Sequence, residues 1–319
     1  MTGKQRPRPM DALDARILQQ HGVEPFTGMA HRPQGLRATD VARVLGRNVR
    51  LVQDRITRMA ESGVIAGYAM VPNPRHLGLE LTTLYVPTHS AADRAAMQAL
   101  SDLDGFVQVI AYLGDGLCLS MSHQKPEELE RRMKSAARLA GDAGPTRPMY
   151  THEVPDVTRE LTALDWRIIA AFAANAKRTL SDVADEVGVT VKTLRTRLKR
   201  LRDEGSVDEV VKLDFSRMEG ILPFEVAVWC DSPEATAARL ADRLQENYLG
   251  HFMGPPGGYC DVLFRVFTHT PAEANDLVGT VANVGGVREA RALMPAGAHD
   301  DPGWLQEAIG MKLAAATNA

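Results

Sequence analysis

Apolar residues near the start of the chain recur every three or four positions, which is the period of an amphipathic helix. The pattern predicts helices at residues 11–21, 39–45 and 48–61. A polar cap is predicted at the start of the second helix, and Asn48 is the predicted cap of the third. Gly46 precedes the third helix and suits the left-handed conformation that ends many helices. An apolar stretch at residues 64–71 then predicts a strand. Three helices with a tight turn before the third, followed by a short hairpin, are typical of a winged helix-turn-helix.

The same pattern returns in the middle of the chain. The motif Leu-Asp-Ala-Arg-Ile at residues 13–17 recurs as Leu-Asp-Trp-Arg-Ile at 164–168, and Asp-Val-Ala at 40–42 recurs at 182–184. The first motif recurs after 151 residues and the second after 142. The first copy therefore contains an insertion between its two motifs, within residues 22–36. Its glycine, proline and histidine content predicts a loop. The second copy predicts helices at 163–175, 181–187 and 190–204 and a strand at 207–213. The second of these helices has a polar cap, Gly188 ends it, and Thr190 is the predicted cap of the third.

Each helical part is followed by a β-α-β-β-α-β pattern, the order of a ferredoxin-like domain. The first copy predicts strands at 82–87, 106–113, 117–122 and 147–153 and helices at 92–103 and 126–140. The second predicts strands at 224–230, 251–253, 261–267 and 287–294 and helices at 233–246 and 271–284. The open face of such a sheet has to be covered, either by the other copy or by a second chain.

The predicted fold class is α+β, with two tandem units of about 145 residues, each a winged helix-turn-helix followed by a ferredoxin-like domain. The predicted domains are 1–72 and 156–215 for the winged helices, 73–155 and 216–299 for the ferredoxin-like parts, and a tail at 300–319. The tail contains one predicted helix at 304–312, and its small-residue end is expected to fray.

Composition limits the classes of function that the chain can have. The 319 residues carry a net charge of −3, so any nucleic-acid contact has to come from a local basic patch. The three cysteines include no close pair, which excludes a disulfide framework and favours a reducing cytoplasm, with Cys118 and Cys230 expected to be buried. No apolar run is long enough for a membrane span, and residues 1–10 carry no signal-peptide segment. We expect no metal and no cofactor.

Both third helices carry basic residues beside an apolar stripe. The second has six basic and two acidic residues, whereas the first has four and two. Such side chains neutralise phosphates or reach base edges, so double-stranded DNA is the predicted partner. An ordinary solvated face is the alternative, especially for the first helix with its exposed Asp54. The predicted DNA-contact residues are Arg47, Asn48, Arg50, Gln53, Arg55, Arg58, Thr190, Lys192, Thr193, Arg195, Thr196, Arg197, Lys199 and Arg200.

The Leu-Asp-x-x-Ile motif, the Asp-Val-Ala helix, the segment Arg-Met-Ala-Glu-Ser-Gly-Val-Ile at 58–65 and the following ferredoxin-like pattern resemble the Lrp/AsnC feast/famine transcription regulators. The resemblance implies a ligand-sensing, RAM-like ferredoxin-like domain that pairs into dimers, so we expect a homodimer or pseudo-tetramer. It also implies a small effector, such as an amino acid, near a Gly-Asp-Tyr-Asp turn that is partly kept here. The predicted effector-binding residues are Gly114, Asp115, Gly116, Gly257, Gly258, Tyr259 and Asp261. A hairpin turn that needs glycine for its backbone is the alternative.

Sirohaem decarboxylases resemble the same family and occur as fused two-copy chains, so an enzyme is the second hypothesis. They use a His-Asn-Tyr segment followed by a second histidine. Here His251 stands at the comparable place, but Phe252 and Met253 follow it, and no second histidine precedes Asp261. The sequence therefore favours a regulator without enzymatic activity. A scaffold that binds protein instead of DNA is a third hypothesis.

Overall fold

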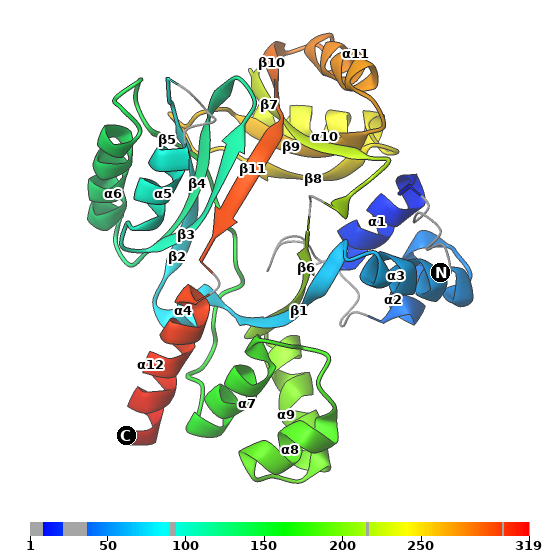
Figure 1. The fold of residues 1–319 in the computed structure, drawn as a ribbon, viewed down its shortest axis with the longest axis vertical. Helices are drawn as coiled ribbons and strands as arrows, with labels where there is room; N and C mark the ends of the chain where they lie inside the picture. The colour runs from blue at the N-terminus through cyan, green and yellow to red at the C-terminus, as the bar shows by residue number, and fades with distance from the viewer. Residues whose placement is uncertain (1–8, 22–36, 90–93, 215–216, 302, 319) are drawn as a thin grey trace, which may run out of the picture. The chain divides into compact units, whose positions relative to one another are not determined.

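The computed structural model describes residues 9–21, 37–89, 94–214, 217–301 and 303–318. The loop predicted within residues 22–36 lies outside them. The chain is a mixed α+β protein, as predicted, and it divides into two compact units, each made of two separate stretches (Figure 1). The first unit combines Met1–Asn73 with Val157–Leu222, and the second combines Pro74–Asp156 with Pro223–Ala319. Within the described residues, no helix is long and apolar enough to cross a membrane.

The first unit contains two sets of three helices, each set followed by one strand. The first set is α1 (Ala12–His21), α2 (Ala38–Leu45), α3 (Val49–Glu61) and β1 (Ile65–Pro72). The second set is α7 (Ala163–Ala173), α8 (Leu180–Val187), α9 (Val191–Asp203) and β6 (Val207–Leu213). These bounds differ from the predicted ones by at most two residues.

Glycine turns lead into both third helices, as predicted. Gly46 and Gly188 end α2 and α8 with φ angles of 60° and 71°, where a side chain would strain the backbone. The next helices begin at the predicted caps: Asn48 accepts a hydrogen bond from the Arg50 N–H, and Thr190 accepts one from the Thr193 N–H. A polar cap is also predicted for α2, but Arg37 stands there, and its side chain makes no capping hydrogen bond.

The strands that follow the third helices pair with each other. β1 and β6 are antiparallel, with Tyr68 opposite Val211 and Ala69 opposite Val210. The wing hairpin predicted after each third helix is wrong for the described residues. Each set provides a single strand, and the strand of the other set satisfies its backbone N–H and C=O groups. Tyr68 and Ala69 correspond to Val210 and Val211 in the repeat, so the pairing is symmetric and a local two-fold axis relates the two strands.

The second unit contains two antiparallel sheets. One has the strand order β11-β3-β4-β2-β5 and the other β10-β7-β9-β8, so the ferredoxin-like order occurs in both. The first of these stretches comprises α4 (Pro74–Leu77), β2 (Glu80–Val86), α5 (Arg94–Ser101), β3 (Phe106–Tyr112), β4 (Asp115–His123), α6 (Pro126–Leu139) and β5 (Arg147–Thr151). The second comprises β7 (Leu222–Cys230), α10 (Pro233–Arg243), β8 (Tyr248–Met253), β9 (Val262–Thr268), α11 (Pro271–Ala282) and β10 (Val287–Leu293).

Two elements at the end of the chain differ from the prediction. β11 (Pro295–Asp300), which the sequence did not predict, is the fifth strand of its sheet. It pairs with β3 and satisfies backbone groups at that edge. α12 (Trp304–Asn318) continues well past the predicted helix and packs on α4. The expected fraying of its small-residue end is wrong, because alanines such as Ala314 are strong helix formers.

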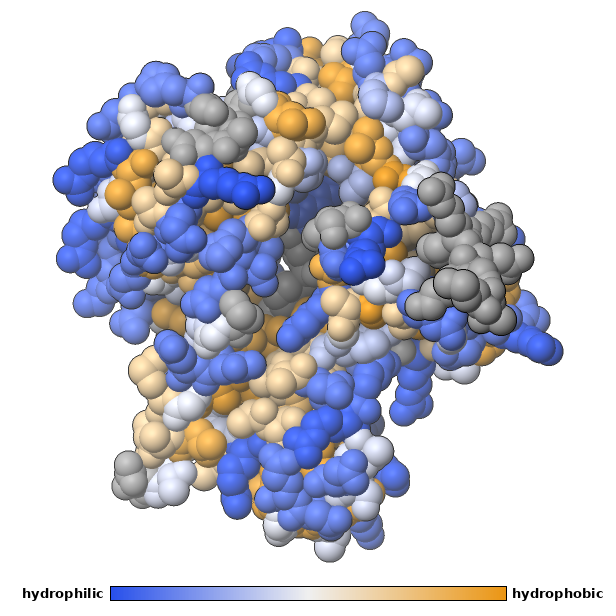
Figure 2. All heavy atoms as spheres, viewed as in Figure 1, coloured by the Kyte–Doolittle hydropathy of each residue, from blue (hydrophilic) through white to orange (hydrophobic). Residues whose placement is uncertain are grey.

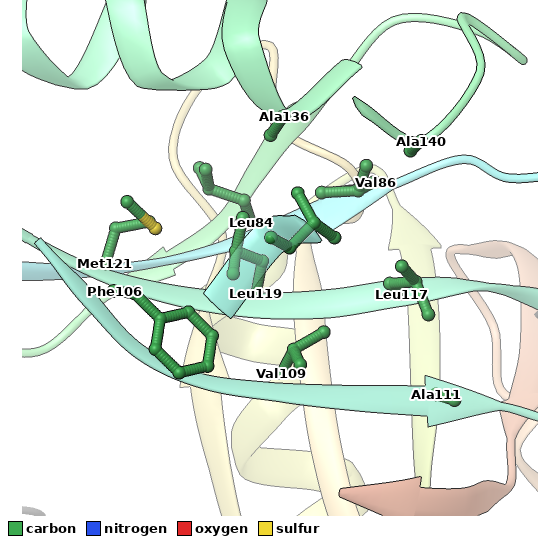
Figure 3. Close-up of a cluster of buried hydrophobic side chains, with 11 residues drawn as sticks. Leu84, Val86, Phe106, Val109, Ala111, Leu117, Leu119, Met121, Ala136 and Ala140 are labelled. Carbon is green, nitrogen blue, oxygen red and sulfur yellow. The ribbon is translucent and has the colours of Figure 1, made fainter. Parts of the chain in front are cut away.

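The two faces of the five-stranded sheet are covered differently. On one face, Leu84, Val109 and Leu119 meet Ala136 of α6 in a fully apolar core (Figure 3). On the other face, Tyr85, Cys118 and Met149 pack against Leu263 and further residues of the four-stranded sheet. The sequence left open what covers the sheets, and in the second unit they cover each other. All three cysteines are buried, Cys260 among them.

Candidate nucleic-acid interface

The exposed face of α9 is basic. Leu194, Leu198 and Leu201 form the buried stripe, and the opposite side is open to solvent. The exposed residues there are Lys192, Thr193, Arg195, Thr196 and Lys199. Hydrophilic side chains gather over the α8–α9 region in Figure 2. A shallow, open pocket on this helix is lined by Lys192, Thr193, Thr196, Arg197 and Arg200. Three cationic and two hydroxyl side chains suit an anionic ligand such as a DNA phosphate.

A buried carboxylate fixes α9 to the first helix of its set. Asp165 of α7 has no exposed side-chain surface, and it forms a reciprocal capping box with Thr162 at the start of that helix. Arg197 and Arg200 reach it from α9 at 3.0 and 3.1 Å, measured from guanidinium nitrogen to Oδ1. Arg159 contacts its other oxygen at 3.3 Å. Asp165 therefore holds three guanidinium groups.

The electrostatics of this cluster favour the charged form of Asp165. Burial by itself raises the pKa of a carboxyl group, but hydrogen bonds from Thr162 and Arg197, together with the charge of Arg197, outweigh it. The result is a pKa of about 2 for Asp165. Asp165 is consequently ionised wherever the protein is studied near neutral pH, and it keeps the arginines oriented.

The other set repeats this arrangement with a different cap. Asp14 of α1 has a 2% exposed side chain and accepts hydrogen bonds from Arg55 at 3.1 Å and from Arg58 at 3.3 Å. Asp11 takes the place of Thr162: its carboxylate accepts the N–H of Asp14 and binds Arg55 at 2.6 Å. The hydrogen bonds from Arg55 and nearby N–H groups lower the pKa of Asp11, against the effect of burial.

These contacts divide the predicted DNA-binding residues into two groups. Four predicted arginines bind the buried aspartates of their own set, namely Arg55, Arg58, Arg197 and Arg200. Sequence reasoning missed the aspartates as their partners. The signal was present, because Asp14 and Asp165 lie in the repeated motif, and arginines recur at the same spacing in both third helices. Lys199 is also paired, with Asp203. In the described part of the chain, Lys192 and Arg195 form no ion pair.

The corresponding face of α3 is less basic and more apolar. Val49 and Leu51 of α3 expose 43% and 39% of their surface, and Val44 at the end of α2 exposes 52%. Arg47, Asn48, Arg50, Gln53 and Asp54 are exposed beside them. Leu51 stands where α9 has Thr193, and Asp54 stands where α9 has Thr196. The predicted DNA contacts of α3 therefore stay a prediction with weaker charge support.

The predicted effector residues form two turns that meet around one tyrosine in the second unit. The Tyr85 hydroxyl accepts the N–H of Gly116 at 3.2 Å, and its ring stacks on Tyr259 with centroids 3.8 Å apart. Gly258 lies against the Pro148 carbonyl, where a Cβ would come within 2.7 Å of the oxygen. Gly114 and Gly257 have φ angles of 67° and 74°, as a glycine turn requires. Asp115, whose backbone begins β4, completes the first turn.

Asp261 of the second turn is already engaged. It accepts the Cys230 N–H at 2.7 Å and Arg288 at 2.9 Å. Tyr259 in turn is held at its carbonyl by the Trp229 indole N–H, at 2.7 Å. The turn residues thus have structural partners within the chain, and effector binding by them stays a prediction.

Polar groups are also buried between the two sheets of the second unit. Glu225 accepts a hydrogen bond from Tyr112 and binds Arg265 at 2.8 Å, and Arg265 reaches the Tyr150 hydroxyl at 3.4 Å. Burial raises the pKa of Glu225 to about 7 and lowers that of Arg265 to about 10. Both directions show that burial opposes the charges of this pair.

The histidines that the structure describes do not gather into a metal site. His251 lies in β8, and its Nδ1 is 2.6 Å from the Tyr248 hydroxyl. Its partial burial lowers its pKa. His152 is half-buried, and desolvation lowers its pKa to about 4. Among the described residues, no group of three or more histidine, cysteine or acidic residues could hold a metal ion.

Known proteins resemble this interface directly. The model of the AsnC-type helix-turn-helix domain matches residues 161–202, which contain α7, α8 and nearly all of α9. Residues 161–202 are thus similar to the AsnC-type helix-turn-helix domain. The resemblance of the sequence to the Lrp/AsnC regulators is thereby confirmed for this part of the chain. The AsnC-type domain includes Asp165 and both α9 arginines that bind it.

Solved structures resemble the chain over a longer range. The siroheme decarboxylase NirDL aligns with 95% of this chain and 99% of that chain, at 11% identity and a TM-score of 0.57. Its complex with an iron-uroporphyrin III analogue covers 96% and 100%, at 13% identity and a TM-score of 0.55. At such identities the likeness shows the fold. AsnC of E. coli covers 44% and 94%, at 13% identity and a TM-score of 0.37. No curated protein matches in sequence.

Proposed function

We propose that this chain is a sequence-specific transcriptional regulator that binds double-stranded DNA through α9 of its AsnC-type domain. The observation that carries the proposal is the match at residues 161–202 together with the basic, exposed face of α9. A third helix that follows a glycine turn is the one that helix-turn-helix proteins place in the major groove. Lys192 and Arg195 project from its first two turns, where base edges are reached.

The internal repeat gives this regulator the organisation of a dimer within one chain. A local two-fold axis relates β1 and β6, the strands that directly follow α3 and α9, which supports a two-fold arrangement of these helices. Two-fold-related recognition helices are the arrangement with which dimeric helix-turn-helix proteins read two half-sites of an operator. The two sets therefore correspond to the two subunits of such a dimer. In the second unit, the sheets that cover each other correspond to a paired set of RAM-like domains.

Selection from a random pool of duplex DNA at about 0.15 M salt tests this function. We expect an enriched motif, and we expect the double variant Lys192→Ala/Arg195→Ala to lose at least tenfold in affinity for it. The slope of log affinity against log salt concentration should fall by about one for each lost phosphate contact. The control is Arg131→Ala/Lys134→Ala, which removes the same charge from two exposed residues of α6.

Both outcomes are informative. If the α9 variant and the α6 control weaken binding equally, the effect is one of net charge, and α9 is not the DNA-reading helix. If the purified protein enriches no motif, a protein-binding scaffold replaces the regulator as the best explanation of an AsnC-type domain in this chain.

A second candidate function is decarboxylation of a sirohaem-like tetrapyrrole. It is supported by the fold that the chain shares with NirDL along 95% of its length. The side chains support it less, because His251 is bound to Tyr248 and is followed by Phe252 and Met253. Titration with an iron uroporphyrin decides between the candidates. Saturable spectral changes that His251→Ala abolishes would favour the enzyme, whereas an unchanged spectrum would leave the regulator.

A further inference from the structure

The two third helices carry different hydrogen-bonding side chains at one exposed pair of equivalent positions. Gln53 of α3 and Arg195 of α9 lie 142 residues apart, which is the spacing of the repeat in this region. Both are exposed, and both follow the buried residue of their helix's first turn, Val52 in α3 and Leu194 in α9. The same site on two matched helices therefore carries an amide in one and a guanidinium in the other.

The buried aspartates show that Gln53 and Arg195 occupy equivalent positions in their helix sets. Asp14 binds Arg55 and Arg58, and Asp165 binds the arginines at the equivalent positions of α9. Each third helix is thus fixed to the first helix of its set by the same pair of contacts. Gln53 and Arg195 each lie two residues before the first of these arginines. They consequently project from their helices in corresponding directions.

Both side chains have the hydrogen-bonding groups that base reading requires. The Gln53 amide makes one long hydrogen bond, from Nε2 to Thr57 Oγ1 at 3.4 Å, which leaves its oxygen and its second N–H. Arg195 makes no ion pair within the described residues. A glutamine amide pairs with N6 and N7 of adenine, whereas arginine pairs with O6 and N7 of guanine. The neighbouring Leu51 adds an apolar group that suits a thymine methyl, where α9 has Thr193.

We propose that one chain reads an asymmetric operator, in which Gln53 selects an A·T pair in one half-site and Arg195 selects a G·C pair at the equivalent position of the other. The proposal rests on the proposed DNA-binding function and adds the base composition of its substrate. A two-fold protein scaffold ordinarily implies a palindromic operator. Here the scaffold is two-fold, but the side chains that it presents are not.

Exchanging the two residues tests the proposal. The selection is repeated with Gln53→Arg, with Arg195→Gln and with the double exchange, and each enriched motif is compared with that of the unmodified chain. We expect Gln53→Arg to give a G·C pair in both half-sites and Arg195→Gln to give an A·T pair in both. The double exchange should restore an asymmetric motif with its halves interchanged. Each single exchange should cost about tenfold or more in affinity for the original operator.

The outcomes separate this inference from the function on which it rests. A palindromic motif for the unmodified chain, or motifs that the exchanges leave unchanged, would overturn the inference while the chain remained a DNA-binding protein. Absence of any motif, with folded protein by circular dichroism, would overturn the proposed function as well. Both residues are exposed, so the exchanges are not expected to disturb folding.

Discussion

The two helix sets of the first unit share a scaffold and differ in the face that they present. In both, a buried aspartate of the first helix binds two arginines of the third, and a glycine turn precedes that third helix. The exposed surfaces diverge: Leu51 and Asp54 in α3 correspond to Thr193 and Thr196 in α9. Features that hold the helices together are therefore repeated, whereas features that a partner would contact are not.

This difference changes what a basic residue in a third helix indicates. An arginine that recurs in both sets, such as Arg55 with Arg197, has a structural partner. A basic residue that occurs in one set only, such as Arg195, is exposed and unpaired within the described residues. Arg195 is consequently a better candidate for binding than the recurring arginines that hold the buried aspartates.

The largest effect on stability is expected when the α9 anchor is removed. Asp165→Ala leaves three guanidinium groups without their carboxylate, which for a buried pair costs about 3–5 kcal/mol. The Arg200 side chain is 42% exposed, so water screens part of this loss, and we expect about 3 kcal/mol of unfolding free energy. Asp14→Ala, with two arginines, should cost less. Urea unfolding followed through buried Trp166, with the other tryptophans replaced by phenylalanine, measures the change.

An exposed ion pair serves as the control for that comparison. Asp40 binds Arg43 on α2, where the arginine side chain is 75% exposed. Asp40→Ala should change the unfolding free energy by less than about 1 kcal/mol. A loss as large as that of Asp165→Ala would contradict the special role of the buried carboxylates.

Most of the fold could be predicted because it follows from local patterns. The helix spacing, the glycine at each turn and the caps Asn48 and Thr190 are properties of neighbouring residues, and the structure confirms them. The single strands after the third helices depend on a partner more than a hundred residues away. Nothing local distinguishes half of a wing from a strand that pairs with its repeat, so the predicted hairpins were wrong. β11 was missed for the same reason.

The candidate site was predicted less completely than the fold. Charge patterning found the basic residues of α9 but gave no direction for their side chains. Arg197 and Arg200 were assigned to DNA because the sequence alone does not show that Asp165 is buried beneath them. The repeat contains that information only when aspartate and arginine positions are compared together. The two predicted effector turns meet only because two sheets pack together, where Tyr85 stacks on Tyr259, and no local pattern shows that packing.

A smaller effect is expected from acidification. The pKa of Asp165 is lowered to about 2, so this group stabilises the folded protein above the ordinary carboxyl range, and the contribution is lost as the pH falls from about 4 to 2. A shift from 3.8 to about 2 corresponds to about 2 kcal/mol. We expect Asp165→Asn to flatten the dependence of unfolding free energy on pH in this window. Unchanged steepness in the variant would show that other carboxylates carry the acid sensitivity.

The smallest expected effect concerns Asp54, an acidic residue of the α3 face where α9 has Thr196. Its negative charge opposes DNA phosphates, so Asp54→Thr should raise affinity for the selected operator about two- to fivefold at low salt and less at high salt. Thr196→Asp should lower it by a similar factor. Titrations at two salt concentrations measure both. If Thr196→Asp weakens binding while Asp54→Thr changes nothing, α9 alone lies at the DNA, and the difference between the sets reflects a loss of binding in the first.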